Sequence, residues 1–364
     1  MDPSQDPLSR RAFLTTVASS AAAASAASLI APAACAVPSA AATSARSSGG
    51  GAAAIASGNG LKAVETALAQ MNGGTAPVDA AVAGVNLNEL DPEDSSVGYG
   101  GLPNEEGVVE LDAAVMEGPT HRAGAVASLR GIKTPSRVAL LVMRRSDHVL
   151  LVGEGARRFA RAHGFVEEEL LTEKSRKLWL YWKETLSDKD DWFPPTAEEL
   201  ANDPVLKNRP TGTIHLSARS ASGDLGCTTT TSGLAFKVPG RVGDSPLIGD
   251  GLYLDNAVGS AGGTGRCEAA ILACGAFAVV ERMRGGRKPV DACLDVLARV
   301  VDQSRKNGNA DGDGKPTFNL VLYALAKDGS FGSASLWSGQ KFAVADDAGA
   351  RLEESGFLFQ TKRS

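Results

Sequence analysis

The sequence Thr211-Gly212-Thr213-Ile214-His215 begins a strand-like run directly after a polar, proline-rich segment. Alternate side chains of a β-strand share a face, so we expect Thr213 and His215 on one face and Ile214 on the other. The apolar face should enter the core between two sheets, and the polar face should line the cavity at the start of the strand. A cut after Gly212 would give Thr213 a free α-amine, whose pKa of about 8 lets it accept the proton of the adjacent hydroxyl.

The cut itself has a chemical route. The Thr213 hydroxyl would attack the Gly212 carbonyl, an acyl shift would form an ester, and water would open it. Glycine before the threonine would favour this attack, because glycine tolerates strained backbone angles. The alternative is an ordinary strand threonine. Two downstream segments favour the cut: Thr228-Thr229-Thr230-Thr231-Ser232-Gly233 and Arg241-Val242-Gly243-Asp244.

Composition indicates a soluble globular chain. It has 364 residues, 43% of them hydrophobic, and a formal net charge of −5. The length suits one large domain or two ordinary ones, and the charge argues against nucleic acid as a partner. The four histidines are dispersed and no C-x-x-C pair occurs, so we expect neither a metal nor an organic cofactor. The cysteines beyond residue 36 are expected to be buried free thiols: Cys227, Cys267, Cys274 and Cys293.

The N-terminus has the pattern of an export signal. Ser9-Arg10-Arg11-Ala12-Phe13-Leu14 precedes an alanine-rich apolar run, which indicates a twin-arginine signal over residues 1–36. Ala34-Cys35-Ala36 offers a cleavage site, so we expect a periplasmic or secreted chain. The alternatives are a low-complexity tail with a chance arginine pair, and a lipoprotein signal at Cys35, which Pro32 disfavours. No later apolar stretch is long enough to span a bilayer, so the mature chain is not expected in a membrane.

Hydrophobic periodicity divides the remaining chain into ordered segments and one connector. Residues 37–54 form an Ala/Ser/Gly-rich lead that we expect to be disordered, and 187–212 form a charged, proline-rich flexible connector. A helix over 174–185 carries Trp179 and Trp182. Such an aromatic stripe more often packs on the core than forms an aromatic surface that binds sugars. The other predicted helices span 61–71, 78–90, 139–145, 156–162, 268–283 and 290–301. The predicted strands span 107–116, 149–152, 213–219, 225–231, 317–326, 331–337 and 342–345.

Five further segments give the chain a family resemblance. They are Ser96-Val97-Gly98-Tyr99-Gly100-Gly101-Leu102-Pro103-Asn104, Leu111-Asp112-Ala113, Thr231-Ser232-Gly233, Gly240-Arg241-Val242-Gly243-Asp244-Ser245-Pro246 and Asp255-Asn256. The chain resembles the glycosylasparaginases (aspartylglucosaminidases), N-terminal nucleophile hydrolases related to plant-type asparaginase/isoaspartyl peptidases. The resemblance implies an α+β fold, a four-layer αββα sandwich of two packed sheets flanked by helices. It also implies an α subunit over 55–212 and a β subunit over 213–364, assembled as an αβ heterodimer or as (αβ)2.

The resemblance also assigns roles to individual residues. It implies Thr213 as the nucleophile, Thr231 as the hydroxyl that supports it, and Gly212-Thr213 as the autocleavage site. Arg241 and Asp244 would bind the α-carboxylate and the α-ammonium of an amino-acid substrate, a task that suits a guanidinium and a carboxylate. By residue type alone, the same two residues fit a surface ion pair within a turn.

A glycine-rich segment supplies the rest of the expected site. Gly262-Gly263-Thr264-Gly265 should form a turn before a helix near Glu268, where backbone N–H groups can face developing negative charge. The resemblance implies that the Thr264 hydroxyl and the Gly265 N–H contact the substrate as an oxyanion hole, worth about 3 kcal/mol per donor. Ser96 and His215 are candidates for supporting roles.

The chain departs from the family pattern at three places. Many glycosylasparaginases have His-Asp before the nucleophile, whereas Thr211 and Gly212 stand here, and Gly-Thr is the arrangement of plant-type relatives. His215 stands where glycine is common, and we expect a hydrogen-bonded buried histidine. Ser57-Gly58-Asn59-Gly60 stands in the region of a family tryptophan.

These features favour an exported, self-processed amidohydrolase acting on a small molecule. We expect it to cleave the side-chain amide of glycosylasparagine, or of another asparagine-derived compound, through a β-aspartyl ester on Thr213. One alternative is a plant-type L-asparaginase or isoaspartyl dipeptidase. A second alternative is a non-processing binding protein on the same fold. The joint presence of Thr213, Thr231, Arg241, Asp244 and Thr264 argues for retained activity.

Overall fold

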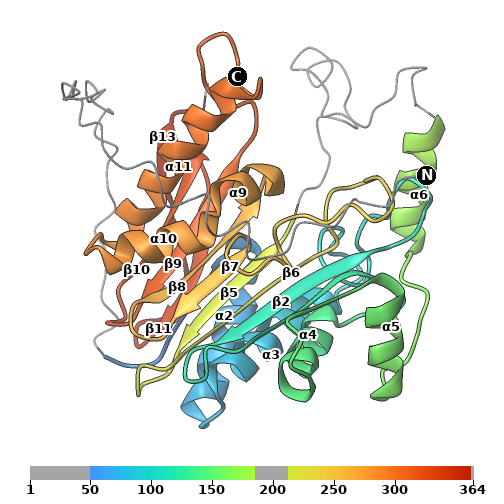
Figure 1. Cartoon of the computed structure of the whole chain (residues 1–364), viewed down its shortest axis with the longest axis horizontal. Helices are drawn as coiled ribbons and strands as arrows, with labels where there is room; N and C mark the ends of the chain where they lie inside the picture. Colours follow the sequence, from blue (N-terminus) through green and yellow to red (C-terminus); the bar gives the residue numbers. More distant parts are fainter. Residues whose placement is uncertain (1–49, 185–211, 362–364) are drawn as a thin grey trace, which may run out of the picture. The chain divides into compact units, whose positions relative to one another are not determined.

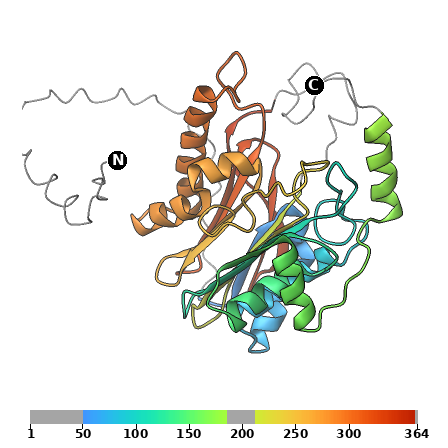
Figure 2. The same ribbon diagram turned by 45° about the vertical axis from the view of Figure 1, so that its right-hand side comes forward.

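The computed structural model describes residues 50–184 and 212–361. The predicted export signal, most of the lead over 37–54, and the connector up to residue 211 lie outside the described residues. Figures 1 and 2 show the described helices and strands from two sides. Among the described helices, none has both the length and the apolar character needed to cross a bilayer.

Two β-sheets contain the named strands (Figure 1). The eight-stranded sheet has the spatial order β12 (Gly349–Glu354), β11 (Lys341–Asp346), β1 (Ala53–Ser57), β5 (Ile214–Arg219), β6 (Leu225–Thr231), β2 (Leu111–Glu117), β3 (Ala123–Leu129) and β4 (Leu150–Val152). The five-stranded sheet has the order β13 (Gly356–Phe359), β10 (Phe331–Trp337), β9 (Leu320–Ala326), β8 (Gly259–Gly265) and β7 (Leu252–Asp255). Only β3–β4 and β10–β13 pair in parallel within these described sheets.

One apolar cluster joins the two sheets. It contains Ile55 and Met116 from the larger sheet and Leu254 and Leu325 from the smaller one. Removing such side chains from water is the dominant favourable term in folding. This cluster therefore holds the sheets face to face and fixes which strands can supply side chains to a common site.

Helices pack on side chains that point away from this shared cluster. Strand alternation in β1 sends Ile55 toward the other sheet, while Ala54 and Ala56 join a helix-side cluster. The helices on the larger sheet are α2 (Leu61–Asn72), α3 (Pro77–Glu89), α4 (Pro135–Arg145) and α5 (Gly153–Ala162). Those on the smaller sheet are α9 (Cys267–Ala273), α10 (Gly275–Arg284) and α11 (Pro289–Lys306). The described chain is thus mixed α/β, with two sheets and helices, compatible with an N-terminal nucleophile hydrolase.

Helix α6 (Glu173–Glu184) confirms the packing interpretation of the tryptophan stripe. Trp182 stacks on Phe236 with ring centroids 4.6 Å apart. The Trp179 indole N–H donates to the Glu105 carbonyl oxygen at 3.1 Å. The first contact ties α6 to the segment that precedes Arg241, and the second ties it to the segment that precedes β2.

Two predictions about elements are wrong, and so is the predicted burial of one cysteine. The expected disordered lead ended at Ala54, but β1 begins at Ala53 and pairs with both β5 and β11. The single helix expected over 268–283 is two helices, because Cys274 adopts a left-handed φ of 47° between them. Cys274 is exposed, whereas the other three cysteines beyond residue 36 are buried, and all four are free thiols.

The faces of β5 are also the reverse of the prediction. Ile214 and Leu216 pack toward α2 and α3, outside the two-sheet interface. The polar face, with His215 and Ser217, points at the smaller sheet. Alternation separated the polar and apolar faces of β5 correctly, but the polar face is the one that lies between the two sheets. The interface therefore contains a hydrogen-bonded polar region next to Thr213.

Candidate active site

Thr213 stands immediately before β5 and is 6% exposed. Antiparallel pairing of β5 with β6 brings it beside Thr231. Thr213 Oγ1 donates to Thr231 Oγ1 at 3.1 Å, and Thr231 Oγ1 donates to the Gly212 carbonyl oxygen at 2.8 Å. The Gly233 N–H also donates to Thr231 Oγ1, at 2.9 Å. A hydroxyl has one proton and two acceptor positions, so the Thr231 hydroxyl is fully used and its direction is fixed.

Gly212 is glycine because Ser96 lies against it. A Cβ atom added at Gly212 would overlap the Ser96 side chain. Ser96 is held in place by Asp94, whose Oδ1 accepts from the Ser96 N–H at 2.9 Å and from its hydroxyl at 2.5 Å. The close approach of Ser96 accounts for glycine at this position.

The end of β1 also reaches Thr213. Ser57 Oγ donates to Asn59 Oδ1 at 2.7 Å and accepts from the His215 N–H at 3.3 Å. The Thr213 carbonyl oxygen lies 3.4 Å from the same Ser57 Oγ. The segment that replaces the family tryptophan thus borders the site with small polar side chains.

Asp244 is buried and Arg241 is partly buried, and both residues of this predicted substrate clamp are incompletely hydrogen-bonded. Asp244 is 1% exposed, and the Arg241 side chain is 17% exposed. Arg241 Nη1 and Asp244 Oδ2 have no hydrogen-bond partner among the described residues. Desolvation by burial raises the pKa of Asp244 to about 6, although a hydrogen bond with Cys267 opposes the rise. Leaving buried polar atoms unpaired costs about 1–3 kcal/mol each, so these two atoms mark where a ligand would bind.

Glu268 fixes the orientation of the Arg241 guanidinium. Its Oε1 accepts from Arg241 Nε at 3.1 Å and from Nη2 at 2.6 Å. The side edge of the guanidinium is therefore occupied. The end edge, formed by Nη1 and the second proton of Nη2, remains for a carboxylate, which can accept two parallel hydrogen bonds there.

Thr264 and Gly265 lie on a strand, so the predicted glycine-rich turn is wrong. They end β8, and α9 begins two residues later at Cys267. Thr264 Oγ1 lies 2.8 Å from the Tyr323 hydroxyl on β9. Gly265 has a φ of 114°, and an added Cβ would lie 2.6 Å from the Asn319 carbonyl oxygen. Both constraints require glycine there.

His215 is the buried, hydrogen-bonded histidine that we expected. Its Nδ1 lies 2.8 Å from Thr229 Oγ1, and its Nε2 lies 2.8 Å from Ser217 Oγ. Burial lowers the pKa of His215 to about 3 by desolvation. The imidazole is therefore neutral at physiological pH and cannot act there as a cationic group.

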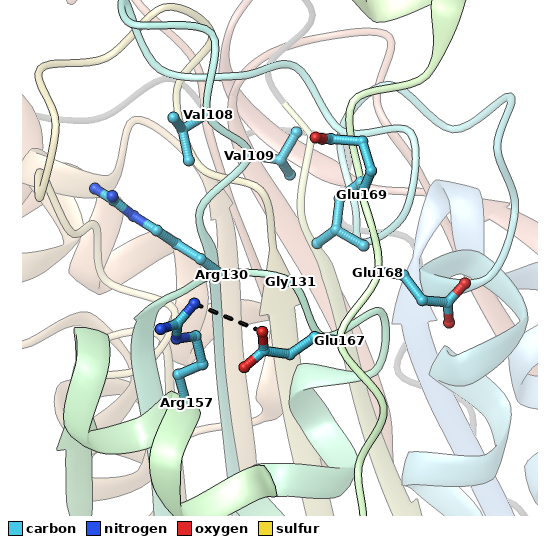
Figure 3. A pocket seen from close by; sticks show the side chains of 9 residues that line it. Val108, Val109, Arg130, Gly131, Arg157, Glu167, Glu168 and Glu169 are labelled. Atoms are coloured by element: carbon cyan, nitrogen blue, oxygen red, sulfur yellow. Dashed lines mark ion pairs between the residues drawn. The ribbon is translucent and has the colours of Figure 1, made fainter.

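A surface pocket involves other residues (Figure 3). In it Arg157 points toward Glu167, with Nη1 and Oε2 3.6 Å apart. The pocket is lined by Val108, Val109, Arg130, Gly131, Arg157, Glu167, Glu168, Glu169 and Leu170. No predicted site residue is in this lining, so the pocket does not extend the candidate active site. The described residues also contain no group of acidic, histidine or cysteine side chains suited to a metal.

Sequence reasoning missed three residues that shape the site. Glu268 and Cys267 contact the clamp, and Tyr323 contacts Thr264. The Arg241–Glu268 pair spans 27 positions and the Thr264–Tyr323 pair spans 59. Hydrophobic periodicity carries no information on such pairs, and no motif marked these residues.

Comparison with known proteins gives this geometry a family. The family model described as asparaginase matches residues 33–315. The N(4)-(beta-N-acetylglucosaminyl)-L-asparaginase of Elizabethkingia miricola is 40% identical over 301 residues, covering 83% of this chain and 83% of that protein. The Mus musculus protein of that name is 34% identical over 289 residues, covering 72% and 78%. The Rattus norvegicus protein is 37% identical over 246 residues, covering 63% and 71%. The chain therefore belongs to the asparaginase family, in the glycosylasparaginase branch of the N-terminal nucleophile hydrolases.

Proposed function

We propose that this chain is an autoproteolytically activated N(4)-(beta-N-acetylglucosaminyl)-L-asparaginase-like amidohydrolase with Thr213 as its nucleophile. The observation that carries the proposal is the Thr231 hydroxyl, which bridges Thr213 Oγ1 and the Gly212 carbonyl oxygen at 3.1 and 2.8 Å. The relatives' names supply the substrate class. The family supplies the reaction, hydrolysis of an amide C–N bond.

Self-cleavage uses this bridge directly. Thr213 Oγ1 attacks the Gly212 carbonyl carbon and passes its proton to Thr231 Oγ1, while the Thr231 hydroxyl passes its own proton to the carbonyl oxygen to which it already donates. The C–N bond breaks, the nitrogen takes the proton, and the acyl group now sits on Thr213 Oγ1. Water hydrolyses this ester, which leaves a Gly212 carboxylate and a free Thr213 amine. The route needs no aspartate before the nucleophile, in keeping with Gly212.

Turnover uses the new amine as the base. It accepts the Thr213 hydroxyl proton while Oγ1 attacks the side-chain amide carbonyl of the substrate. The Thr264 hydroxyl and the Gly265 N–H stabilise the resulting oxyanion. The ammonium then protonates the departing glycosylamine, and water hydrolyses the β-aspartyl ester to release aspartate.

The clamp selects a free amino-acid end. Arg241 Nη1 and Asp244 Oδ2, which have no partner among the described residues, would bind the α-carboxylate and the α-ammonium of the substrate. An internal peptide residue lacks both charges and would leave both buried groups unpaired. The clamp therefore favours a free asparagine derivative over an asparagine inside a polypeptide.

A plant-type asparaginase or isoaspartyl dipeptidase is the second candidate. Gly212 favours it, because Gly-Thr is the arrangement in those relatives. All three substrate classes share the same clamp and differ only in the group released. Glycosylasparagine, asparagine and a β-aspartyl dipeptide should therefore be assayed side by side, and the proposal expects the highest kcat/KM for glycosylasparagine.

Assembly and location complete the proposal. Opposite-facing side chains of β1 and β9 pack on different clusters, which supports a four-layer αββα sandwich. Cleavage at residue 212 would yield an αβ heterodimer, with (αβ)2 as the larger assembly. The twin-arginine signal over 1–36 would carry the folded chain to the periplasm or beyond.

Intact mass and N-terminal sequencing test the self-cleavage. We expect two fragments, the smaller beginning Thr-Ile-His-Leu-Ser. Thr213→Val should stay whole and lose turnover by at least about 10⁴-fold. An uncut, fully active chain would contradict the proposal, whereas an uncut, inactive chain that binds aspartate would favour the binding-protein alternative.

Two strand threonines offer a matched comparison. Thr231→Val removes the bridging hydroxyl and should slow both cleavage and turnover by about 100-fold. Thr228→Val, on the same strand, removes a hydroxyl that donates only to the Ala114 carbonyl oxygen. Its cleavage and turnover should stay close to wild type. Equal effects of both substitutions would remove the role of Thr231.

A further inference from the structure

His215 belongs to a buried chain of hydrogen bonds with a single direction. The Thr229 hydroxyl donates to the Gly251 carbonyl oxygen at 3.0 Å, so its oxygen must accept from His215 Nδ1. His215 Nε2 then accepts from the Ser217 hydroxyl, and Ser217 Oγ accepts from Ser260 at 2.7 Å. Each hydroxyl has one proton, which fixes the neutral tautomer with hydrogen on Nδ1. We call Thr229, His215, Ser217 and Ser260 the His215 relay.

The relay fixes the imidazole across the gap between the two sheets. The ring fills the space left by Gly262 on β8, where an added Cβ would overlap the imidazole. Gly262 is the register partner of Tyr323 on β9. The imidazole and the Tyr323 ring lie 6.1 Å apart, centroid to centroid, with 13° between their planes. His215 thereby limits the positions that the Tyr323 ring can take.

Tyr323 in turn sets the direction of the Thr264 hydroxyl. Tyr323 is 2% exposed, and Thr264 Oγ1 is the hydrogen-bond partner that the described residues offer its hydroxyl. If Thr264 donated to Tyr323, the buried phenol proton would have no acceptor, at a cost of about 1–3 kcal/mol. Tyr323 therefore donates to Thr264 Oγ1, which leaves the Thr264 proton free for the substrate oxyanion.

We propose that His215 and Tyr323 are positioning residues that aim the Thr264 hydroxyl proton at the reacting carbonyl. This inference rests on the proposed function and adds two residues to it that do not touch the substrate. Tyr323 acts through its hydroxyl, and His215 acts by holding the Tyr323 ring. The expected signature is a loss of kcat with KM preserved, because the Arg241–Asp244 clamp is untouched.

A double-mutant cycle tests the Tyr323 step. Tyr323→Phe keeps the ring and removes only the hydroxyl, and should lower kcat by about tenfold. Thr264→Val should lower it by about 100-fold, the effect of losing an oxyanion donor. In the Thr264→Val background, Tyr323→Phe should have no further effect, since the two substitutions break one interaction. Tyr253→Phe, on β7 and outside the site, is the matched control and should leave kcat unchanged.

A compensating pair tests the His215 step. Gly262→Ala alone should lower both the melting temperature and kcat, because the new methyl group and the imidazole compete for one space. In His215→Ala/Gly262→Ala the conflict is removed, so the melting temperature should recover most of the loss. Its kcat should remain at least about tenfold below wild type with KM within about twofold, because the Tyr323 ring is no longer held.

Each outcome decides between the alternatives. Additive effects of Tyr323→Phe and Thr264→Val, in an active wild type, overturn the inference and leave the proposed function intact. Full recovery of kcat in the double variant shows that His215 only fills space, and also overturns it. A correctly folded wild type inactive on all three amides contradicts the proposed function itself, and the inference with it.

Discussion

The clamp and the His215 relay are two buried polar regions that differ in whether their polar atoms all have hydrogen-bond partners. Every side chain in the relay is paired in one continuous chain. The clamp leaves Arg241 Nη1 and Asp244 Oδ2 without a partner among the described residues. In a low-dielectric interior, an unpaired polar group lowers the free energy of unfolding, whereas a hydrogen bond between paired groups is stronger than in water. The relay is therefore complete as it stands, whereas the clamp needs a ligand to complete it.

Between these two regions, the larger effect on activity is expected at the clamp. Arg241→Ala should lower kcat/KM by about 10³-fold, mostly through KM, because the substrate carboxylate and Asp244 both lose their counter-charge. Self-cleavage should persist. Arg266→Ala is the control, since Arg266 also pairs with Glu268, at 3.4 Å, and should change kcat/KM by less than about fivefold. Steady-state kinetics and denaturing gels provide both readouts, and an unchanged KM in Arg241→Ala would remove the clamp assignment.

Asp244→Asn should weaken substrate binding and at the same time raise the stability of the ligand-free protein. Losing the carboxylate should raise KM by about 100-fold, since one charge-assisted hydrogen bond is lost. The ligand-free protein should melt at a higher temperature than wild type at pH 8, because a buried carboxylate with one oxygen lacking a hydrogen bond has been removed. Scanning calorimetry without ligand tests this opposition. A lower melting temperature would mean that the Asp244 carboxylate already has all its hydrogen-bond partners, as the side chains of the relay do.

The raised pKa of Asp244, about 6, predicts a pH-dependent response to aspartate. The folded state holds this proton more tightly than the unfolded state, whose pKa is near 3.8. Its stabilising contribution is thus present below pH 3.8 and is lost as the pH rises through 6. A bound α-ammonium would offset that loss. Aspartate should therefore raise the melting temperature more at pH 7.5 than at pH 5, and equal shifts would contradict an ionised Asp244 in the complex.

The smallest expected effect is at the end of the relay. Ser260→Ala removes the donor to Ser217 and should lower the free energy of unfolding by about 1 kcal/mol. Its kcat should stay within about twofold of wild type, because Ser217 can still donate to His215. Urea unfolding and steady-state kinetics test this. A loss of kcat larger than that of Tyr323→Phe would show that the relay takes part in the chemistry.

Local pattern was sufficient for some parts of the fold. The β5–β6 hairpin followed from alternation and a polar turn, and the strand Phe331–Trp337 was predicted at its observed bounds. Strand β1 was missed because Ala53–Ser57 continues an alanine-rich run without alternation. Strand β8 was read as a turn because it is rich in glycine, yet Gly262 and Gly265 are there to admit His215 and the Asn319 carbonyl.

For the candidate site too, some residues could be predicted from the sequence and others could not. The resemblance to the family predicted Thr213, Thr231, Arg241, Asp244, Thr264 and Gly265 as site residues. Their supporting contacts with Glu268 and Tyr323 depend on how the sheets pack, which no single segment encodes. The orientation of β5 failed for the same reason. Alternation separates two faces but does not say which one the rest of the chain will cover.

The order of strands in the larger sheet has a consequence for a chain cut after Gly212. Strand β1 from the first fragment lies between β11 and β5 from the second, and β2 from the first pairs with β6 from the second. Strands from the two fragments would therefore alternate within one hydrogen-bonded sheet. The two fragments should therefore elute together in native chromatography. If each fragment were expressed from its own gene, neither should fold without the other.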